Sequence, residues 1–169
     1  LFVRERIKAL AKLCELRVVA PVPWFIPVKF FGEQYYNYTQ VQRHEKQETL
    51  EVFHPRFLVV PKIGKFLDGW LMFYSLRKFA RYRRKDFAYE LIDAHYAYPD
   101  GYAAGRIAKE LGVPYTVTVR GSDITLLARE KLRGVLIRQS LLGASRVICV
   151  AESLKKEVIT TLDIPTAKI

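Results

Sequence analysis

The chain has 169 residues, half of them hydrophobic, and a formal net charge of +11. This composition excludes an intrinsically disordered chain and predicts a single domain, residues 1–169, with a sizeable core. No apolar run is long enough to cross a bilayer. No signal peptide is visible, although the chain opens abruptly on Leu1 and Phe2.

The basic residues are concentrated in the first half of the chain. Residues 1–85 hold 17 Lys and Arg against 7 Asp and Glu, whereas residues 86–169 hold 11 against 10. This asymmetry favours an anionic partner for the first half, such as a phospholipid surface, a nucleic acid or an anionic substrate. A basic surface that contacts only solvent is the alternative.

The chain opens with the pattern of a helix followed by a strand. Apolar residues at helical spacing predict a helix over Phe2–Leu13, and a strand is predicted over Leu16–Ala20. A β-α-β unit needs a strand ahead of its helix, so we expect a first strand that this sequence lacks. The chain is therefore predicted to be a fragment or to lack its N-terminal residues.

The stretch Pro21–Gln40 has no sustained period, which predicts a long loop. Its aromatic side chains either cap the edge of the sheet, or contact a sugar or a membrane interface. They are Trp24, Phe25, Phe30, Phe31, Tyr35, Tyr36 and Tyr38. Short strands are predicted next over Glu51–His54 and Phe57–Val60, with Pro55 interrupting them near an edge or a bulge.

A helix is predicted over Phe66–Lys85, and its second half is strongly basic. Cations near a helix C-terminus stabilise the helix dipole without any ligand. Alternatively, this segment contacts anionic lipid head groups, with nucleic acid as the less favoured partner. The cations are Arg77, Lys78, Arg81, Arg83, Arg84 and Lys85.

The residues from Leu91 to Ile124 form the centre of the predicted fold. A strand over Leu91–Ala94 ends on His95, and a helix with one apolar face follows. Gly112 is placed for the left-handed turn after that helix, before the β-branched strand Tyr115–Val119. A helix of this length joins strands that are parallel neighbours, so we expect both strands to end at one edge of the sheet.

The remainder continues the alternation of helices and strands. A long helix is predicted over Thr125–Leu142 with Ser122 or Asp123 as its N-cap, then a central strand over Ser145–Val150 and a helix over Ala151–Leu162. The predicted fold is therefore α/β, a Rossmann-like parallel sheet with helices on both faces and its first strand missing.

The candidate site lies where the two central strands end. His95 and the turn Arg120-Gly121-Ser122-Asp123 would share the carboxyl edge, where open α/β sheets hold ligands. An imidazole, a guanidinium and a carboxylate in one crevice suit a polyhydroxylated, phosphorylated molecule. The alternative is that His95 only satisfies backbone groups and that Asp123 is only a helix cap.

Several other site classes are not supported. Cys14 and Cys149 lie among apolar residues without CxxC spacing, which predicts buried thiols of a reduced compartment. With three scattered histidines, we expect no metal site. GxGxxG, GxxxxGK[ST] and GxSxG are all absent from the sequence, so a dinucleotide fingerprint, a P-loop and a hydrolase elbow are not supported.

The stretch IDAHYAYPDGYAAGRIAKELGVPYTVTVRGSDI resembles the acceptor-side, N-terminal domain of retaining GT-B glycosyltransferases of family GT4. It is most similar to the bacterial and archaeal subgroup linked to exopolysaccharide and cell-surface glycan synthesis. The similarity extends through FVRERIKALAK, VVAPVPWF, FHPRFLVVPKIG and SRVICVAESLKKEV. The resemblance implies the N-terminal half of a GT-B fold, without the C-terminal domain that binds most of the donor.

The resemblance also implies roles for individual residues. The family carries an HxH pair at a strand end, where this chain has Asp93 and His95, and His95 matches the active-site histidine. Arg120, Gly121, Ser122 and Asp123 match a turn that lines the acceptor cleft, with Arg120 where many relatives have histidine. Gly101 matches a small residue in the loop after the histidine.

The resemblance further implies the reaction and its partners. The parent enzyme would move a sugar from a nucleotide-diphosphate donor to a glycan or lipid-linked acceptor, without a metal or other cofactor. Localisation would be cytoplasmic, with peripheral contact at the inner face of the plasma membrane, and this fragment alone would be inactive. A non-catalytic Rossmann-like module that binds an anionic ligand or nucleic acid is the alternative.

Overall fold

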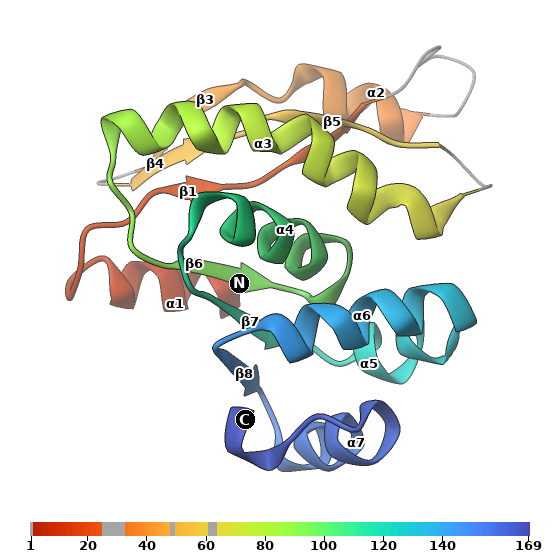
Figure 1. The fold of residues 1–169 in the computed structure, drawn as a ribbon. Helices are drawn as coiled ribbons and strands as arrows, with labels where there is room; N and C mark the ends of the chain where they lie inside the picture. Colours follow the sequence, from red (N-terminus) through yellow and green to blue (C-terminus); the bar gives the residue numbers. More distant parts are fainter. Residues whose placement is uncertain (1, 25–32, 48–49, 61–63) are drawn as a thin grey trace.

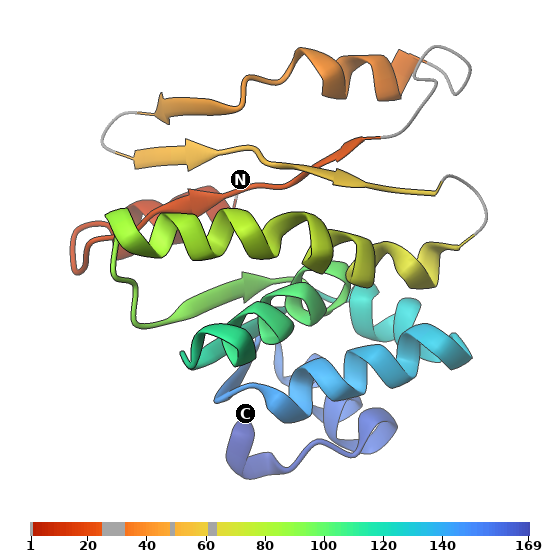
Figure 2. The same ribbon diagram turned by 45° about the horizontal axis from the view of Figure 1, so that its top comes forward.

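The structure is a computed structural model that describes residues 2–24, 33–47, 50–60 and 64–169. Parallel strands form its middle layer, and helices flank them (Figures 1 and 2). The views show α3 (Asp68–Asp86), α4 (Tyr102–Leu111) and α6 (Lys131–Gly143) on one face of the strands, with α1 (Phe2–Leu10) and α7 (Glu152–Leu162) on the other. The α/β class and the Rossmann-like arrangement are confirmed.

Two prolines divide the strands of the first half. β1 (Val18–Val19) pairs in parallel with β4 (Leu50–Phe53), and β2 (Val22–Trp24) pairs in parallel with β5 (Arg56–Leu58). Pro21 and Pro55 stand between these two pairs and have no N–H for the ladder. The ladder resumes at once, because the Val22 N–H donates to the Pro55 carbonyl at 2.9 Å. The interruption predicted at Pro55 is confirmed.

The second half contains a three-stranded parallel sheet, in the order β6 (Ile92–His95), β7 (Tyr115–Val119) and β8 (Arg146–Cys149). β7 is the middle strand of this sheet among the described residues, which corrects the prediction that the Ser145–Val150 strand is central. The predicted parallel pairing of the strand that ends on His95 with the strand Tyr115–Val119 is confirmed, with Ala94 opposite Val117.

The core consists of two hydrophobic clusters that meet at α4. One surrounds β7 and contains Val117, Ile137 and Leu141, all fully buried. The other contains the α3 residues Phe73 and Leu76. α4 contributes to both, with Ala108 and Tyr102 in the first and Ala103 and Ile107 in the second. The apolar face that was predicted for the helix after His95 therefore packs against both clusters and joins them.

Four local predictions are corrected. Residues 21–40 contain β2 and the helix α2 (Glu33–Gln40), and β3 (His44–Gln47) adds an antiparallel strand beside β4 that its charged sequence concealed. The helix expected over Thr125–Leu142 is broken into α5 (Ser122–Thr125), a turn over Leu127–Arg129 and α6.

The predicted N-cap of that helix is also corrected, because Gly121 and not Ser122 or Asp123 is the residue that precedes α5. Cys14 is exposed.

Some predictions concern residues outside the described ranges. Of the aromatic residues in the predicted loop, Phe25, Phe30 and Phe31 lie there, and the expected strand ahead of residue 1 stays a prediction. Within the described ranges, none of the helices is both long and apolar enough to span a bilayer.

Gly112 ends α4 in the left-handed conformation, with φ of 64°. The side of Gly112 where a Cβ would lie is open, so a substitution there meets backbone strain and no clash. We expect Gly112→Ala to lower the free energy of unfolding by about 1–2 kcal/mol, the cost of an L-residue in this conformation. Chemical denaturation measures the change. An unchanged midpoint would contradict the observed helix end.

Candidate functional site

His95 and the turn Arg120–Asp123 lie beside each other at the carboxyl edge of β6 and β7. His95 is the last residue of β6 and stands opposite Thr118, which is two residues ahead of Arg120. The Tyr96 N–H donates to the Thr118 carbonyl at 2.9 Å, so the strands remain paired up to the turn. The predicted juxtaposition at one sheet edge is confirmed.

Asp123 joins the two loops that follow these strands. Its Oδ2 accepts from the Ala97 N–H at 2.8 Å, and its Oδ1 accepts from the Arg120 and Gly121 N–H groups at 3.0 and 2.9 Å. The side chain is fully buried. The buried Asp123 side chain therefore holds both loops in place. Its carboxylate is not accessible to a ligand, whereas the predicted acceptor-side role would require an accessible carboxylate.

The outer surface of the turn carries Ser122, which is exposed. Its hydroxyl lies 2.7 Å from the Tyr96 hydroxyl, so a side-chain contact also joins the loops above the buried carboxylate. Tyr96 and Gly121 both have positive φ, 87° and 123°, which turns the chain sharply after each strand. Among the predicted turn residues, Arg120 and Ser122 are those that can reach a bound molecule.

His95 lies on a polar face of the sheet together with Asp93, Thr116 and Thr118. Its Nε2 is 3.6 Å from Asp93 Oδ2, and the Thr116 hydroxyl donates to Asp93 Oδ1 at 2.6 Å. From α1, the Arg6 guanidinium reaches Asp93 Oδ2 at 3.0 Å and donates to the Thr118 hydroxyl at 2.6 Å. This face thus contains a linked network of charged and hydroxyl groups.

Burial lowers the pKa of His95 below its ordinary value. The Asp93 carboxylate opposes this effect by favouring the imidazolium, whereas the Arg6 and Arg120 cations add to it. The lowered pKa indicates a neutral imidazole at neutral pH. The structure gives His95 Nδ1 no hydrogen-bond partner among the described residues.

Gly101 does not line the edge. It is buried, and a Cβ at this position would lie 2.9 Å from Ser140 Oγ, 3.1 Å from the Tyr96 carbonyl oxygen and 3.2 Å from Val117 Cγ1. The loop after β6 therefore packs closely on α6, and glycine is needed for that approach. The predicted contact of Gly101 with substrate is replaced by this packing role.

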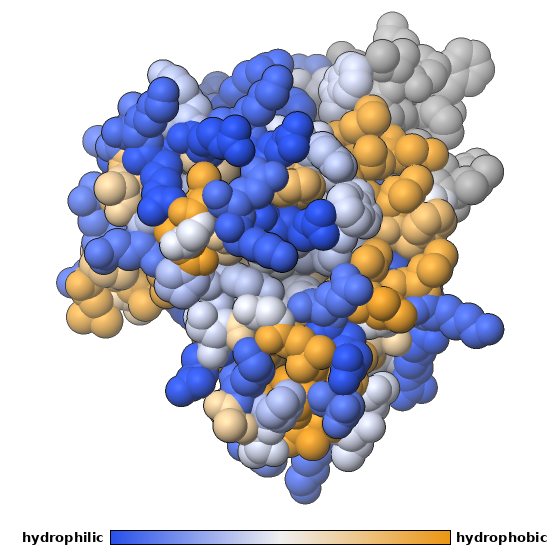
Figure 3. Space-filling view, in the orientation of Figure 1, coloured by the Kyte–Doolittle hydropathy of each residue, from blue (hydrophilic) through white to orange (hydrophobic). Residues whose placement is uncertain are grey.

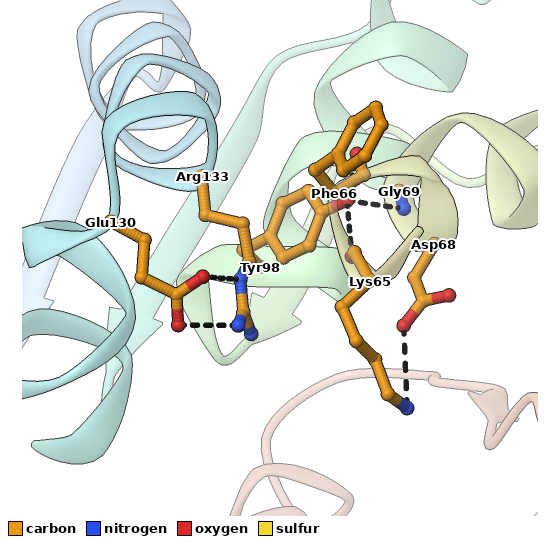
Figure 4. A network of polar contacts seen from close by, with 7 residues as sticks. All are labelled: Lys65, Phe66, Asp68, Gly69, Tyr98, Glu130 and Arg133. Carbon is orange, nitrogen blue, oxygen red and sulfur yellow. Dashed lines mark hydrogen bonds and ion pairs between the residues drawn. The ribbon is translucent and has the colours of Figure 1, made fainter. Parts of the chain in front are cut away.

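Tyr98 holds the same loop to the start of α3 (Figure 4). Its buried hydroxyl accepts from the Gly69 N–H at 3.0 Å and donates to the Phe66 carbonyl at 2.5 Å. Burial raises the pKa of this hydroxyl to about 12. Beside it, Arg133 forms an ion pair with Glu130 (Figure 4). Asp123 and Tyr98 thus fix the loop after His95 from two sides.

The basic half of α3 is largely engaged within the protein. Arg77 and Arg81 pair with Glu110 of α4 at 3.9 and 3.2 Å. Arg83 pairs with Asp86 and lies 4.5 Å from the centre of the Phe53 ring, and Arg84 donates to the Leu111 carbonyl. Among the described residues, no partner is recorded for Lys78 and Lys85. Three of these six cations, Arg77, Arg81 and Arg84, therefore support the α3–α4 contact.

The molecular surface has an apolar edge away from these cations. Hydrophilic side chains gather over α3 on the left of Figure 3, and hydrophobic ones follow the right-hand edge. Exposed apolar side chains stand where β2 and β5 end and where α3 begins: Trp24, Leu58, Val60, Phe66 and Leu67.

The carboxyl end of β8 borders a hollow of about 390 Å³. Cys149, Glu152 and Lys155 line it with neighbouring apolar residues. Burial raises the pKa of the Cys149 thiol, and Asp123 and Glu152 raise it further against the opposing charge of Lys155. A thiol with a raised pKa is a poor nucleophile, so Cys149 is not a candidate catalytic group. Within the described ranges, no three His, Cys, Asp or Glu side chains are grouped as metal ligands.

The fold is that of a Rossmann-like α/β protein, a class in which ligands are held at the carboxyl ends of the strands. The sequence profile of Glycosyltransferase Family 4 matches residues 2–169, and the chain belongs to that family. A Bacillus subtilis protein, TuaC, named as a glycosyltransferase of teichuronic acid biosynthesis, is 25% identical over 159 residues, which cover 92% of this chain and 41% of that protein. An uncharacterized glycosyltransferase of Methanocaldococcus jannaschii is 26% identical over 69 residues, 41% of this chain and 20% of that protein.

Sequence reasoning missed Arg6 and the threonines of β7. One signal was available, because Asp93 lies inside an otherwise apolar strand and a carboxylate there needs a cation or hydrogen-bond donors. Thr116 on the neighbouring strand supplies such a donor, and Thr118, two residues further along the same face, accepts from Arg6. The cation comes from α1, more than 80 residues away, which no local pattern indicates.

We expect Asp123→Asn to lower the free energy of unfolding by about 2 kcal/mol. The amide replaces one acceptor with a donor, which leaves a buried backbone N–H without its partner. Ser122→Ala is the matched control, because it removes an exposed hydroxyl from the same turn and should cost less than about 0.5 kcal/mol. Denaturant titrations of both variants measure the difference. Equal stability of the two would show that the loops are held by other contacts.

Proposed function

We propose that this chain is the acceptor-side part of a retaining glycosyltransferase of the GT-B type. The whole enzyme would move a sugar from a nucleotide-diphosphate donor to a glycan or lipid-linked acceptor in cell-surface polysaccharide synthesis. The observation that carries the proposal is the position of His95, at the carboxyl edge of a parallel sheet where the neighbouring strand leads into the Arg120–Asp123 turn, in a chain of Glycosyltransferase Family 4. The name of the Bacillus subtilis relative supports a polysaccharide product.

The chain spans 41% of the length of that relative, so activity is proposed for a longer protein with a second, donor-binding domain. His95 would contact the donor sugar near the reacting carbon. As a neutral imidazole it can donate one hydrogen bond and accept another, which suits sugar hydroxyl groups. Arg120 and Ser122 would shape the acceptor side, while Asp123 and Gly101 would act by holding the loops.

The proposed chemistry depends on placement and charge. The acceptor would attack on the face from which the nucleotide diphosphate departs, through an oxocarbenium-like transition state. Rigid loops reduce the cost of bringing donor and acceptor together, because their positions are fixed before the substrates bind. Arg120 places positive charge near the edge, where a leaving group gains negative charge. No step in this scheme requires a metal or another cofactor.

We expect His95→Ala to reduce sugar transfer at least 100-fold in the complete gene product that contains this chain, with kcat falling more than KM changes. The substrates for the measurement come from a screen of nucleotide sugars with lipid-linked and glycan acceptors. His54→Ala is the control, since His54 bonds the Ala20 carbonyl and Glu45 away from the edge. Turnover of His95→Ala within a few-fold of wild type would remove His95 from the active site.

A lipid-linked acceptor would require contact with a membrane surface, and we propose that the apolar edge provides it. Trp24, Leu58 and Phe66 are exposed there, and the positive charge of the first half favours anionic lipid. We expect the chain to bind vesicles that contain anionic phospholipid, and to release them as salt rises. Leu58→Ser should weaken binding more than Leu132→Ser, a matched change on α6. Failure to bind at low salt would contradict membrane contact.

A further inference from the structure

The polar face of β6 and β7 holds one ion pair that the proposed reaction does not use directly. Arg6 Nη2 lies 3.0 Å from Asp93 Oδ2, and His95 Nε2 lies 3.6 Å from the same oxygen. The arginine and the imidazole therefore share one carboxylate oxygen. The shorter distance belongs to the arginine, whose charge is permanent.

The other contacts of this network fix the arginine and the carboxylate in place. Arg6 Nη1 donates to the Thr118 hydroxyl at 2.6 Å, and Thr118 is only 2% exposed and stands opposite His95 in the strand register. The Thr116 hydroxyl donates to the second oxygen of Asp93 at 2.6 Å. Both side chains of the ion pair are partly screened from water, at 33% and 25% exposed.

We propose that Arg6 is a positioning residue for His95: its guanidinium engages the Asp93 carboxylate and so leaves the imidazole uncharged and free for a ligand. Without Arg6, the carboxylate would have the imidazole as its nearest cationic partner and would favour the imidazolium. The chemical consequence rests on the proposed function, in which a neutral His95 contacts sugar hydroxyls. The electrostatic consequence can be measured without any activity.

Among the described residues, the charged groups that act on His95 come from three segments. Asp93 of β6 favours the protonated ring, and Arg6 of α1 and Arg120 after β7 disfavour it, in addition to burial. Removing Arg6 should therefore raise the pKa of His95, and removing the Asp93 charge should lower it. A general loss of packing would not shift the pKa of His95 in opposite directions when the two partners of one ion pair are replaced in turn.

The test is a pH titration of the histidine ring protons by NMR. The chain has only three histidines, and His44→Gln and His54→Gln variants assign the signal of His95. We expect Arg6→Gln to shift the His95 midpoint to higher pH and Asp93→Asn to shift it to lower pH. Lys12→Gln, which removes an exposed cation just after α1, should leave the midpoint unchanged.

Arg6→Lys keeps the charge but not the two-pronged contact, and should give a smaller upward shift than Arg6→Gln. If Arg6→Gln is unfolded, Arg6→Lys and Asp93→Asn still decide the matter by the signs of their shifts. Either of two results would overturn the proposal. One is a His95 midpoint that is the same in Arg6→Gln as in Lys12→Gln, and the other is a His95 midpoint that is higher in Asp93→Asn than in the wild type. These outcomes are independent of sugar transfer, so they are separable from failure of the proposed function.

Discussion

The buried carboxylate of Asp123 is the constraint on which this edge of the protein depends. It accepts backbone N–H groups from both loops that follow the central strands, at 2.8 to 3.0 Å. Because an unpaired carboxylate or N–H is costly in a dry interior, these contacts allow the two loops few other arrangements. His95 precedes one loop and Arg120 begins the other, so the distance between the two candidate ligand-binding groups is set by a residue beneath them.

The sheet around this constraint has two chemically different faces. Ala94 and Val117 pack under α4 and α6 in the hydrophobic core, while Asp93, His95, Thr116 and Thr118 form the opposite, polar face. Alternation along a strand produces this division directly. The apolar face contributes stability, and the polar face accommodates an ion pair and an imidazole of lowered pKa that would be too costly in the core. The candidate functional groups and the stabilising hydrophobic core therefore lie on opposite sides of the same two strands.

Much of the fold followed from periodicity, and the failures have definite physical causes. The alternation of strands and helices, the left-handed end of α4 at Gly112 and the meeting of His95 with the 120–123 turn were all predicted correctly. The broken helix after Asp123 was missed, because Leu126, Leu127 and Ala128 continue a helical apolar pattern through a turn. The burial of Asp123 and Gly101 was missed because the same residue types serve a ligand site or a loop anchor, and only tertiary contacts separate these roles. Arg6 was missed because its partner lies far along the chain.

We propose that a sugar is transferred at the sheet edge that carries His95 and Arg120. The most direct measurement is a structure of the complete gene product with its nucleotide sugar bound. The account predicts the His95 imidazole within hydrogen-bond distance of the donor sugar, with the Arg120–Asp123 loop unmoved beneath the acceptor side. A donor sugar bound far from His95 would contradict it.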